Sequence, residues 1–356
     1  MNKVCLLSGR NALWHAMPVL GIKNEAEILV PSYNCGAEID PIVKQGCGVQ
    51  LYKVNTDLSI DTEDLKEKIA HRTKAVLVIH YFGFPQPVDL IRDICNEHGL
   101  YLIEDCSHAL FSMYCNRPLG SFGDVAVFSM RKFLPVPDGG ILVINNSALQ
   151  LPEGLRPPTF KYEMHKRALQ FILKMTGIDN RLLLLLYDFI SRSFLRHEVP
   201  NGWPNAADEN LPARWYNYRI DSSTVNRTIS KTTLSVLGKI AKDELMEEII
   251  RRRRSNFLFA VEETKNSNSA TPVFDSLPEG ICPSTFPVLV KERKEKHNLL
   301  LRKGIFCLKT WPVFYPGMPW EQFPEAVFLK KHIISIPIKQ DFKKQRFHEA
   351  MNWLKD

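Results

Sequence analysis

The fold class of this chain can be inferred from residues 73–107, TKAVLVIHYFGFPQPVDLIRDICNEHGLYLIEDCS. The segment starts with a run of apolar, largely β-branched residues, continues with a helical pattern at 89–99, and ends with a second apolar run at 101–107. Continuous apolar strands joined by amphipathic helices are typical of parallel sheets that are covered on both faces. The segment therefore predicts part of a mostly parallel α/β sheet.

The same alternation extends in both directions along the chain. Apolar runs predict further strands, and amphipathic patterns predict helices between them; the strands are at 26–33, 48–55, 124–130 and 139–146, and the helices at 8–22, 36–46 and 62–72. Prolines break this rhythm at about 150–210, which predicts a helical insertion. We expect a three-layer large domain over residues 1–230.

The remainder, residues 231–356, reads as a smaller α+β domain. It contains one long helical pattern, two strand patterns and two shorter helices, at 234–257, 283–292, 332–338, 294–305 and 342–355. The long pattern ends near Arg251–Arg254, after acidic residues, and this order of charges suits the C-terminal end of a helix with its basic residues in water.

Composition excludes several classes of protein. The chain has 356 residues, 45% of them hydrophobic and 24% charged, with a net charge of +7, so it can bury a large core. Its eight cysteines lack metal-ligand spacing, which predicts reduced thiols and no metal site. The positive charge suits an anionic small substrate, and no motif supports nucleic-acid binding.

The chain also lacks the pattern of a membrane protein. Its N-terminus shows no secretory signal, which predicts a cytoplasmic location. The longest apolar stretch, residues 182–190, is shorter than the roughly 20 residues that a transmembrane helix needs. With residues 167–175 it would form a helical hairpin, either packed within the protein or lying at a subunit or membrane surface.

Ligands of parallel α/β sheets bind beyond the carboxyl ends of the strands, so the segments that follow strands are candidate sites. Ser8 and Gly9 lead directly into a helix, whose free N–H groups would hold a phosphate. The same two residues would also serve simply as a helix cap.

Three other segments carry reactive side chains at predicted strand ends. Glu104, Asp105 and His108 follow one buried strand, and an acid in that position needs a cationic partner. Lys132 follows another strand, in the loop FSMRKFLPVPDGG at 128–140. Tyr33 lies in VPSYNCG, at the end of a third. Taken singly, each has an ordinary structural role, and a loop lysine is usually solvated.

Together these groups match the needs of pyridoxal phosphate. This cofactor requires a lysine for a Schiff base, a carboxylate beside its pyridine nitrogen, a helix N-terminus for its phosphate and a side chain against its ring. Lys132, Asp105, the Ser8 turn with Ser129, and His108 would fill these roles.

Six ordered motifs strengthen this interpretation: SGRNAL (8–13), EILVPSYNCGAEIDPI (27–42), RTKAVLVIHYFGFPQPVD (72–89), GLYLIEDCSHAL (99–110), LGSFGDVAVFSM (119–130) and DGGILVIN (138–145). In order and spacing they resemble the DegT/DnrJ/EryC1/StrS family of sugar aminotransferases. The resemblance implies a homodimeric, fold-type I pyridoxal phosphate enzyme that moves an amino group, usually from glutamate, to a keto group of a nucleotide-linked sugar. It also implies a role in bacterial surface polysaccharide or antibiotic sugar synthesis.

The resemblance assigns roles to individual residues. Lys132 corresponds to the Schiff-base lysine, Asp105 to the partner of the pyridinium nitrogen, His108 to a residue beside the cofactor ring, and Ser129 to a phosphate-binding serine. A lysine in this role must be neutral to accept a proton, and burial would favour that state.

Further residues follow from the same resemblance. Gly9, Arg10 and Asn11 match the phosphate-binding turn of the family. Asn226 corresponds to an asparagine that family members lend to the neighbouring subunit's phosphate, although Asn217 resembles the same motif.

The sequence also departs from the family pattern. The loop from Ser129 to Lys132 is shorter than usual, and Arg131 would reach a phosphate or a substrate carboxylate. Cys35 stands where many members have an aromatic residue that stacks on the cofactor. Either Tyr33 would take this place or the cofactor ring would rest on His108 alone. Family members also carry a longer segment before the phosphate turn, which helps to shape their substrate entrance.

These departures leave three alternatives. One is a non-catalytic homologue. A second is a dehydratase-type relative, in which a histidine would replace Lys132. The third is a protein held at a membrane surface through residues 167–195.

Overall fold

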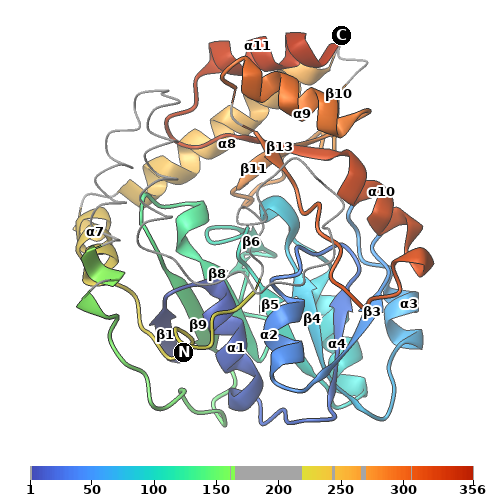
Figure 1. The fold of residues 1–356 in the computed structure, drawn as a ribbon, viewed down its shortest axis with the longest axis vertical. Coiled ribbons are helices and arrows are strands. Elements are labelled where there is room, and N and C mark those ends of the chain that lie inside the picture. Colours follow the sequence, from blue (N-terminus) through green and yellow to red (C-terminus); the bar gives the residue numbers. More distant parts are fainter. Residues whose placement is uncertain are drawn as a thin grey trace, which may run out of the picture.

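The computed structural model describes residues 2–160, 162–164, 219–242, 245–265, 270–305 and 307–355. Within these residues the chain forms a central seven-stranded sheet of order β1-β9-β8-β5-β4-β2-β3 (Figure 1). Its strands are β1 Asn2–Leu6, β2 Glu27–Pro31, β3 Gly48–Tyr52, β4 Thr73–Ile79, β5 Tyr101–Asp105, β8 Val125–Ser129 and β9 Gly140–Ile144. In this sheet β9 is the one strand that runs opposite to the other six, so only the pairs β1–β9 and β8–β9 are antiparallel. The prediction of a mostly parallel sheet is confirmed. The strand β1 was not expected from the sequence.

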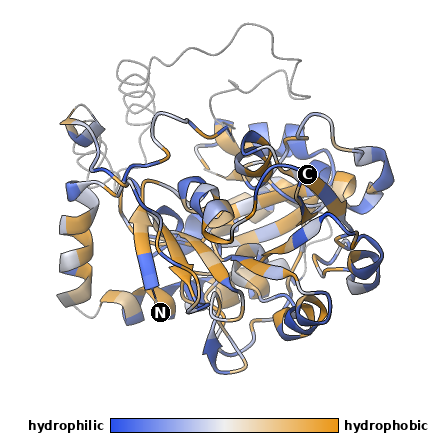
Figure 2. Cartoon of the chain, turned by 90° about the horizontal axis from the view of Figure 1, so that it is seen from below, coloured by the Kyte–Doolittle hydropathy of each residue, from blue (hydrophilic) through white to orange (hydrophobic). Residues whose placement is uncertain are grey.

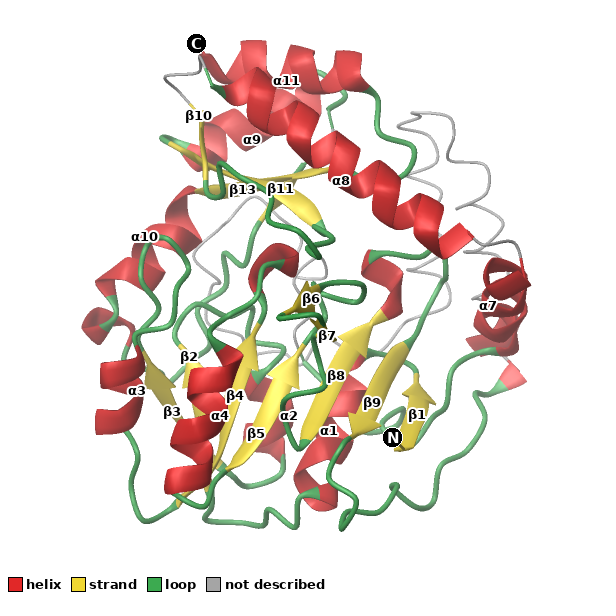
Figure 3. Cartoon of the chain, turned by 180° about the vertical axis from the view of Figure 1, so that it is seen from behind, coloured by secondary structure: helices red, strands yellow, loops and turns green. Residues whose placement is uncertain are grey.

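Helices cover both faces of this sheet, as Figures 1 and 3 show from opposite sides. The helices are α1 Gly9–Val19, α2 Ile39–Lys44, α3 Thr62–Glu67 and α4 Val88–Glu97. Alternate residues of β4 separate the two faces: Leu77 belongs to the hydrophobic cluster of α1 and α2, and Val76 to that of α3 and α4. This period of two in a strand that is buried on both sides explains its unbroken apolar run.

The C-terminal part builds a second sheet of order β10-β11-β13-β12. Its elements are α7 Lys231–Lys242, α8 Leu245–Thr264, β10 Ala270–Pro272, β11 Thr285–Val290, α9 Arg293–Arg302, β12 Leu308–Lys309, α10 Pro324–His332, β13 Ile333–Pro337 and α11 Lys344–Lys355. The single long helix predicted at 234–257 corresponds to the two described helices α7 and α8, and residues 243–244 between them lie outside the described residues. The division into domains at residue 230 stays a prediction.

Short elements complete the described chain. They are the hairpin β6 Met113–Tyr114 and β7 Arg117–Pro118, and the 3-10 turns η1 Tyr81–Gly83, η2 Met130–Lys132 and η4 Trp320–Gln322. The turns η1 and η2 directly follow β4 and β8, so they lie at the carboxyl ends of two central strands.

The two sheets share one hydrophobic core. The ring of Phe84, just beyond β4, stacks on Phe274 at 3.8 Å and lies 5.5 Å from Phe257 of α8. The C-terminal part therefore packs directly over the carboxyl ends of the parallel strands. Figure 2 shows the apolar strands enclosed by helices that are more hydrophilic on their outer sides.

Two expectations from the sequence meet different outcomes here. Arg251–Arg254 lie inside α8, which continues to Thr264, so their placement at a helix end is wrong, and Arg253 is fully buried. Residues 167–195 and Asn217 lie outside the described residues. Among the helices that the structure describes, none has the length and apolar character needed to cross a bilayer.

Candidate active site

The phosphate turn predicted at Ser8 and Gly9 lies between the ends of β5 and β8. A Cβ atom on Gly9 would be 3.3 Å from Ser107 Oγ and 3.8 Å from Ser129 Cβ. One on Gly140 would be 2.1 Å from the main chain of Ser8, so only glycine permits this close approach. The structure thus brings together three segments that are far apart in the sequence.

Ser8 caps α1 in an extended conformation and accepts a hydrogen bond from the backbone N–H of Asn11 at 3.3 Å. The first turn of α1 contains no acidic residue, which leaves the positive end of the helix dipole uncompensated. The side chain of Asn11 donates to the carbonyls of Thr224 and Val225, and that of Arg10 donates to the carbonyl of Arg219. Backbone amides of this turn, rather than the Asn11 side chain, are therefore the donors best placed for an anion.

The two acids that end β5 serve different purposes because successive side chains point to opposite faces of a strand. Glu104 is fully buried and accepts hydrogen bonds from the amides of Gly120, Phe122 and Gly123, and it contacts His80 at 3.2 Å. Burial alone would raise the pKa of Glu104, but these bonds outweigh it and lower the pKa. Glu104 is thus a structural carboxylate.

Asp105 points the other way, toward the predicted lysine. One of its oxygens accepts a hydrogen bond from the amide of Ser107 at 2.8 Å. The carboxylate is one of the charges that act on Lys132, whose pKa burial lowers and Asp105 partly restores. Asp105 is thus an electrostatic neighbour of Lys132, and the role of this pair toward a cofactor stays a prediction.

The short loop that carries Lys132 is fixed by two side chains of the C-terminal part. Arg253 of α8 donates to the carbonyl of Lys132 at 3.0 Å and to that of Ser284 at 2.8 Å, and its guanidinium lies 4.7 Å from the ring centre of Phe133. Gln340 donates to the carbonyl of Phe133 at 2.9 Å. These long-range hydrogen bonds therefore fix the main chain of the lysine loop.

His108 and Tyr33 supply polar atoms that no described residue satisfies. Both side chains are buried, and His108 Nδ1 and Tyr33 Oη have no hydrogen-bond partner in the part of the chain that the structure describes. Burial, reinforced by the charge of Lys132, lowers the pKa of His108 well below its usual value, so the imidazole is neutral. Unpaired buried polar atoms are rare, and a missing ligand is one ordinary explanation.

A second carboxyl group, Glu38, was not predicted from the sequence. It is buried, accepts a hydrogen bond from the amide of Cys35 at 3.1 Å, and lies within 3.2 Å of the Cys35 thiol. Burial and then the neighbouring Asp105 raise the pKa of Glu38. No local pattern in GAEIDPI distinguishes this glutamate from a solvated helix residue, because its burial depends on tertiary contacts.

The asparagine predicted to reach a neighbouring subunit lies on the surface. Asn226 is exposed, and its carbonyl accepts a hydrogen bond from the amide of Arg156 at 2.8 Å. The adjoining Thr228 bridges to Leu6 of β1. The exposed side chain is therefore free of the interior of its own subunit.

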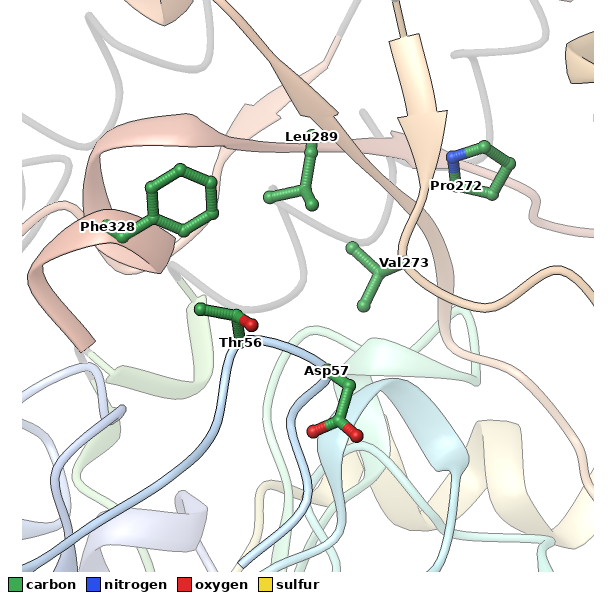
Figure 4. Close-up of a pocket in the computed structure, with 6 residues that line it drawn as sticks. All are labelled: Thr56, Asp57, Pro272, Val273, Leu289 and Phe328. Carbon is green, nitrogen blue, oxygen red and sulfur yellow. The ribbon is translucent and has the colours of Figure 1, made fainter. Parts of the chain in front are cut away.

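A separate open groove lies between the loop after β3 and the C-terminal sheet (Figure 4). Its lining consists of Thr56, Asp57, Pro272, Val273, Leu289 and Phe328. None of the predicted site residues is among them. The groove and the predicted site near Lys132 are therefore separate places in the described part of the chain.

The residues around Lys132 fit pyridoxal phosphate. They offer a half-buried lysine, a carboxylate that acts on it, a helix N-terminus with hydroxyls of Ser8 and Ser129, and two polar atoms on aromatic side chains that no described residue satisfies. The donor set matches the phosphate, the pyridine ring and the carbonyl group of that cofactor.

Comparison with known proteins also indicates an aminotransferase. The model of the DegT/DnrJ/EryC1/StrS aminotransferase family matches residues 2–178. The GDP-perosamine synthase of Escherichia coli O157:H7 is 30% identical over 341 residues, which cover 94% of this chain and 76% of that protein. A GDP-perosamine synthase of Vibrio cholerae is 37% identical over 152 residues, but the match spans only 41% of its length.

Solved structures agree on the fold. The aminotransferase TlmJ of Streptoalloteichus hindustanus superposes with a TM-score of 0.68 at 20% identity, covering 99% of this chain and 84% of that one. Helicobacter pylori PseC, an aminotransferase of pseudaminic acid biosynthesis, gives 0.66 at 19% identity, covering 99% and 86%.

Proposed function

The chain belongs to the DegT/DnrJ/EryC1/StrS aminotransferase family, and from this we propose that it transfers an amino group from L-glutamate to the keto carbon of a nucleotide-linked sugar. Its cofactor is pyridoxal 5′-phosphate, which when bound supplies the carbonyl group and the electron sink for the transfer. The observation that carries the proposal is the half-buried Lys132 just after β8, with Asp105 at the end of the adjacent β5 as its electrostatic neighbour.

Lys132 would bind the cofactor covalently and then move the proton between donor and cofactor. Burial lowers the pKa of Lys132 from its usual value of 10.5, which raises the fraction of neutral amine near neutral pH. Only the neutral amine is a nucleophile and a base, so the site prepares this lysine for both tasks.

Asp105 would hold the ring nitrogen in its protonated state. One carboxylate oxygen is occupied by the amide of Ser107, which orients the group, and the other oxygen is available to accept an N–H donor. His108 would lie beside the ring as a neutral imidazole, with Tyr33 as a second polar contact.

The phosphate would bind at the N-terminus of α1. Backbone amides from Gly9 to Asn11, the hydroxyl of Ser129 and the charge of Arg10 surround this place. Asn226 would complete the site of a neighbouring subunit, which requires a homodimer.

The substrate class follows from the relatives. Those named above are GDP-perosamine synthases, and another, from Saccharopolyspora spinosa, is named dTDP-4-dehydro-2,3,6-trideoxy-D-glucose 4-aminotransferase and is 28% identical over 87% of this chain. A keto-sugar carried by a nucleoside diphosphate is therefore the proposed acceptor. We place the reaction in polysaccharide or related sugar biosynthesis in the cytoplasm.

One spectroscopic experiment tests the function. The protein mixed with pyridoxal phosphate should gain a visible absorption band that L-glutamate bleaches, and borohydride should fix the cofactor to a peptide containing Lys132. The variant Lys132→Ala should fix none, whereas Lys68→Ala, with a lysine on the surface, should behave as wild type. Fixation at full stoichiometry in Lys132→Ala would disprove the assignment, and binding without bleaching by any amino donor would favour a non-catalytic homologue.

A further inference from the structure

Lys330 of α10 is a lysine buried completely between the two parts of the protein. Its amine donates to the main-chain carbonyls of Asn34, Trp311 and Val313. Three carbonyls match the three N–H donors of an ammonium group. In the described part of the chain, no carboxylate lies within ion-pair distance of it, so main-chain oxygens supply the hydrogen bonds that offset the cost of burying the amine.

Aromatic rings surround the same amine. The Lys330 nitrogen lies 4.8 Å from the ring centre of Trp320, 5.5 Å from that of Phe314 and 5.8 Å from that of Tyr33. Ring faces attract a cation at these distances, more strongly where water is excluded. The cage therefore fixes Lys330, and with it the loop 311–314, against the end of β2.

Trp311 occupies a conformation that needs such support. Its φ is +47°, in the left-handed region that a residue with a large side chain adopts only under strain. Lys330 binds the carbonyls of Trp311 and of Val313, one on each side of the turn. These two bonds account for the persistence of the strained turn.

The strained turn directs the indole onto the carboxyl ends of the central strands. The centre of the Trp311 ring system lies 4.9 Å from that of Tyr33, 5.6 Å from Tyr81 and 5.3 Å from His108. These three residues follow β2, β4 and β5. Trp311 therefore packs over the ends of these three strands, directly beside His108 of the predicted site.

We propose that Trp311 is the aromatic wall of the cofactor cleft and that Lys330 is the positioning residue that holds it there. The assignment of the wall rests on the proposed function, since it places the cofactor beside His108. The assignment of Lys330 rests only on contacts within the chain. The C-terminal part thus contributes a residue to the site, and the indole face offers an apolar surface for the cofactor or for the sugar bound next to it.

The role of Lys330 is tested on the cofactor-free protein. The fluorescence emission of Trp311 is obtained by subtracting the spectrum of Trp311→Phe from that of wild type. The same subtraction is then made between Lys330→Met and the double variant that also carries Trp311→Phe. We expect a shift to longer wavelength in the Lys330→Met background, because the partly buried indole moves further into water, and no shift with Lys331→Met, an exposed neighbour on the same helix. If Lys330→Met does not fold, Lys330→Gln serves instead, and an unchanged emission overturns the positioning role.

The role of Trp311 as a wall is tested by adding pyridoxal phosphate. The subtracted Trp311 emission should be quenched almost completely, and Trp311→Phe should weaken cofactor binding several-fold, whereas Trp353→Phe on α11 should leave the affinity unchanged. If the cofactor is fixed to Lys132 by borohydride while Trp311 emission persists, the wall is wrong. If no cofactor is fixed in wild type, the proposed function fails, and the cofactor-free measurement still judges Lys330.

Discussion

Arg253 donates a hydrogen bond from its guanidinium to the main-chain carbonyl of Lys132, at 3.0 Å and across 121 residues of sequence. Lys132 lies in the turn η2 after β8 and Arg253 lies in α8 of the C-terminal part, so the position of the lysine depends on how the C-terminal part packs. An exposed guanidinium could not do this, because water would compete for the carbonyl. Among the described residues, no carboxylate forms an ion pair with Arg253, so its charge is buried at a cost in free energy. The hydrogen bonds that it donates fix the main chain of the short lysine loop in return.

Replacing this arginine tests the dependence. Arg253→Met keeps an apolar stem but leaves the buried carbonyls of Lys132 and Ser284 without a donor, which should lower the free energy of unfolding by about 2 to 4 kcal/mol. Arg251→Met removes only an exposed ion pair with Glu248 and should cost less than about 1 kcal/mol. Urea unfolding of both variants decides this; equal losses would contradict a special role for Arg253.

The reactivity of Lys132 should depend on pH in a way that its neighbours control. Burial lowers its pKa, Asp105 raises it and Arg131 lowers it further. Asp105→Asn removes the charge that raises the pKa, so the pH profile of borohydride-trapped cofactor should move to lower pH. Arg131→Met should move it the other way, by a fraction of a pH unit because this arginine is solvent-exposed and screened. Shifts of the same sign in both variants would refute the electrostatic account.

Glu104 should make the fold sensitive to acid. The pKa of Glu104 is lower in the folded protein than its usual 4.5, so its contribution is complete above the unfolded value and is lost as pH falls through the folded value. Glu104→Gln should lower the free energy of unfolding at pH 7 by about 3 kcal/mol and flatten its decline below pH 5. A decline as steep as that of wild type would show that other groups dominate acid unfolding.

The parts of the fold that depend on local pattern could be predicted from the sequence. The runs of β2, β4, β5 and β8 are apolar because both faces of these strands are buried, and reactive side chains at their ends converge for the same topological reason. Lys132 and Asp105 were found in this way. The edge strand β1 is short and partly exposed, so it carries no comparable pattern.

Charged residues in buried positions were missed, although their spacing held a signal. Arg253 lies on the buried face of α8 with Ile249, Phe257 and Ala260. A single charged residue on such an apolar face indicates that its charge has a buried partner. Arg253 was read instead with its basic neighbours as a solvated run. No sequence pattern indicates the position of Trp311, because this position depends on a turn that Lys330 of α10 fixes.

The close approach of β9 to the phosphate turn predicts a large effect of a small change. Gly140→Ala places a carbon about 2.1 Å from the Ser8 main chain, which must move, so stability should fall by about 1 to 3 kcal/mol or more and cofactor affinity by at least about tenfold. Gly238→Ala is the matched control, since no described atom lies within 4 Å of the added carbon on α7. It should stabilise the helix by up to about 1 kcal/mol. Calorimetry and cofactor titration separate the two; tight cofactor binding by Gly140→Ala would mean that the turn does not hold the phosphate.

Lys330 should leave a mark on the pH dependence of stability. Burial lowers the pKa of Lys330 from 10.5 to about 7, although nearby Cys35 and Glu38 partly oppose this. Between those two pH values the unfolded chain binds more protons than the folded one, so this lysine makes the free energy of unfolding rise with pH, and its penalty is complete below about pH 7. The test is to measure the free energy of unfolding of wild type and of Lys330→Met from pH 7 to 10. Titratable groups that both proteins share contribute equally and cancel in the difference between them. As pH rises, this difference should change by about 1 kcal/mol or more in favour of wild type. A constant difference would mean that the three carbonyls hold Lys330 charged throughout this range.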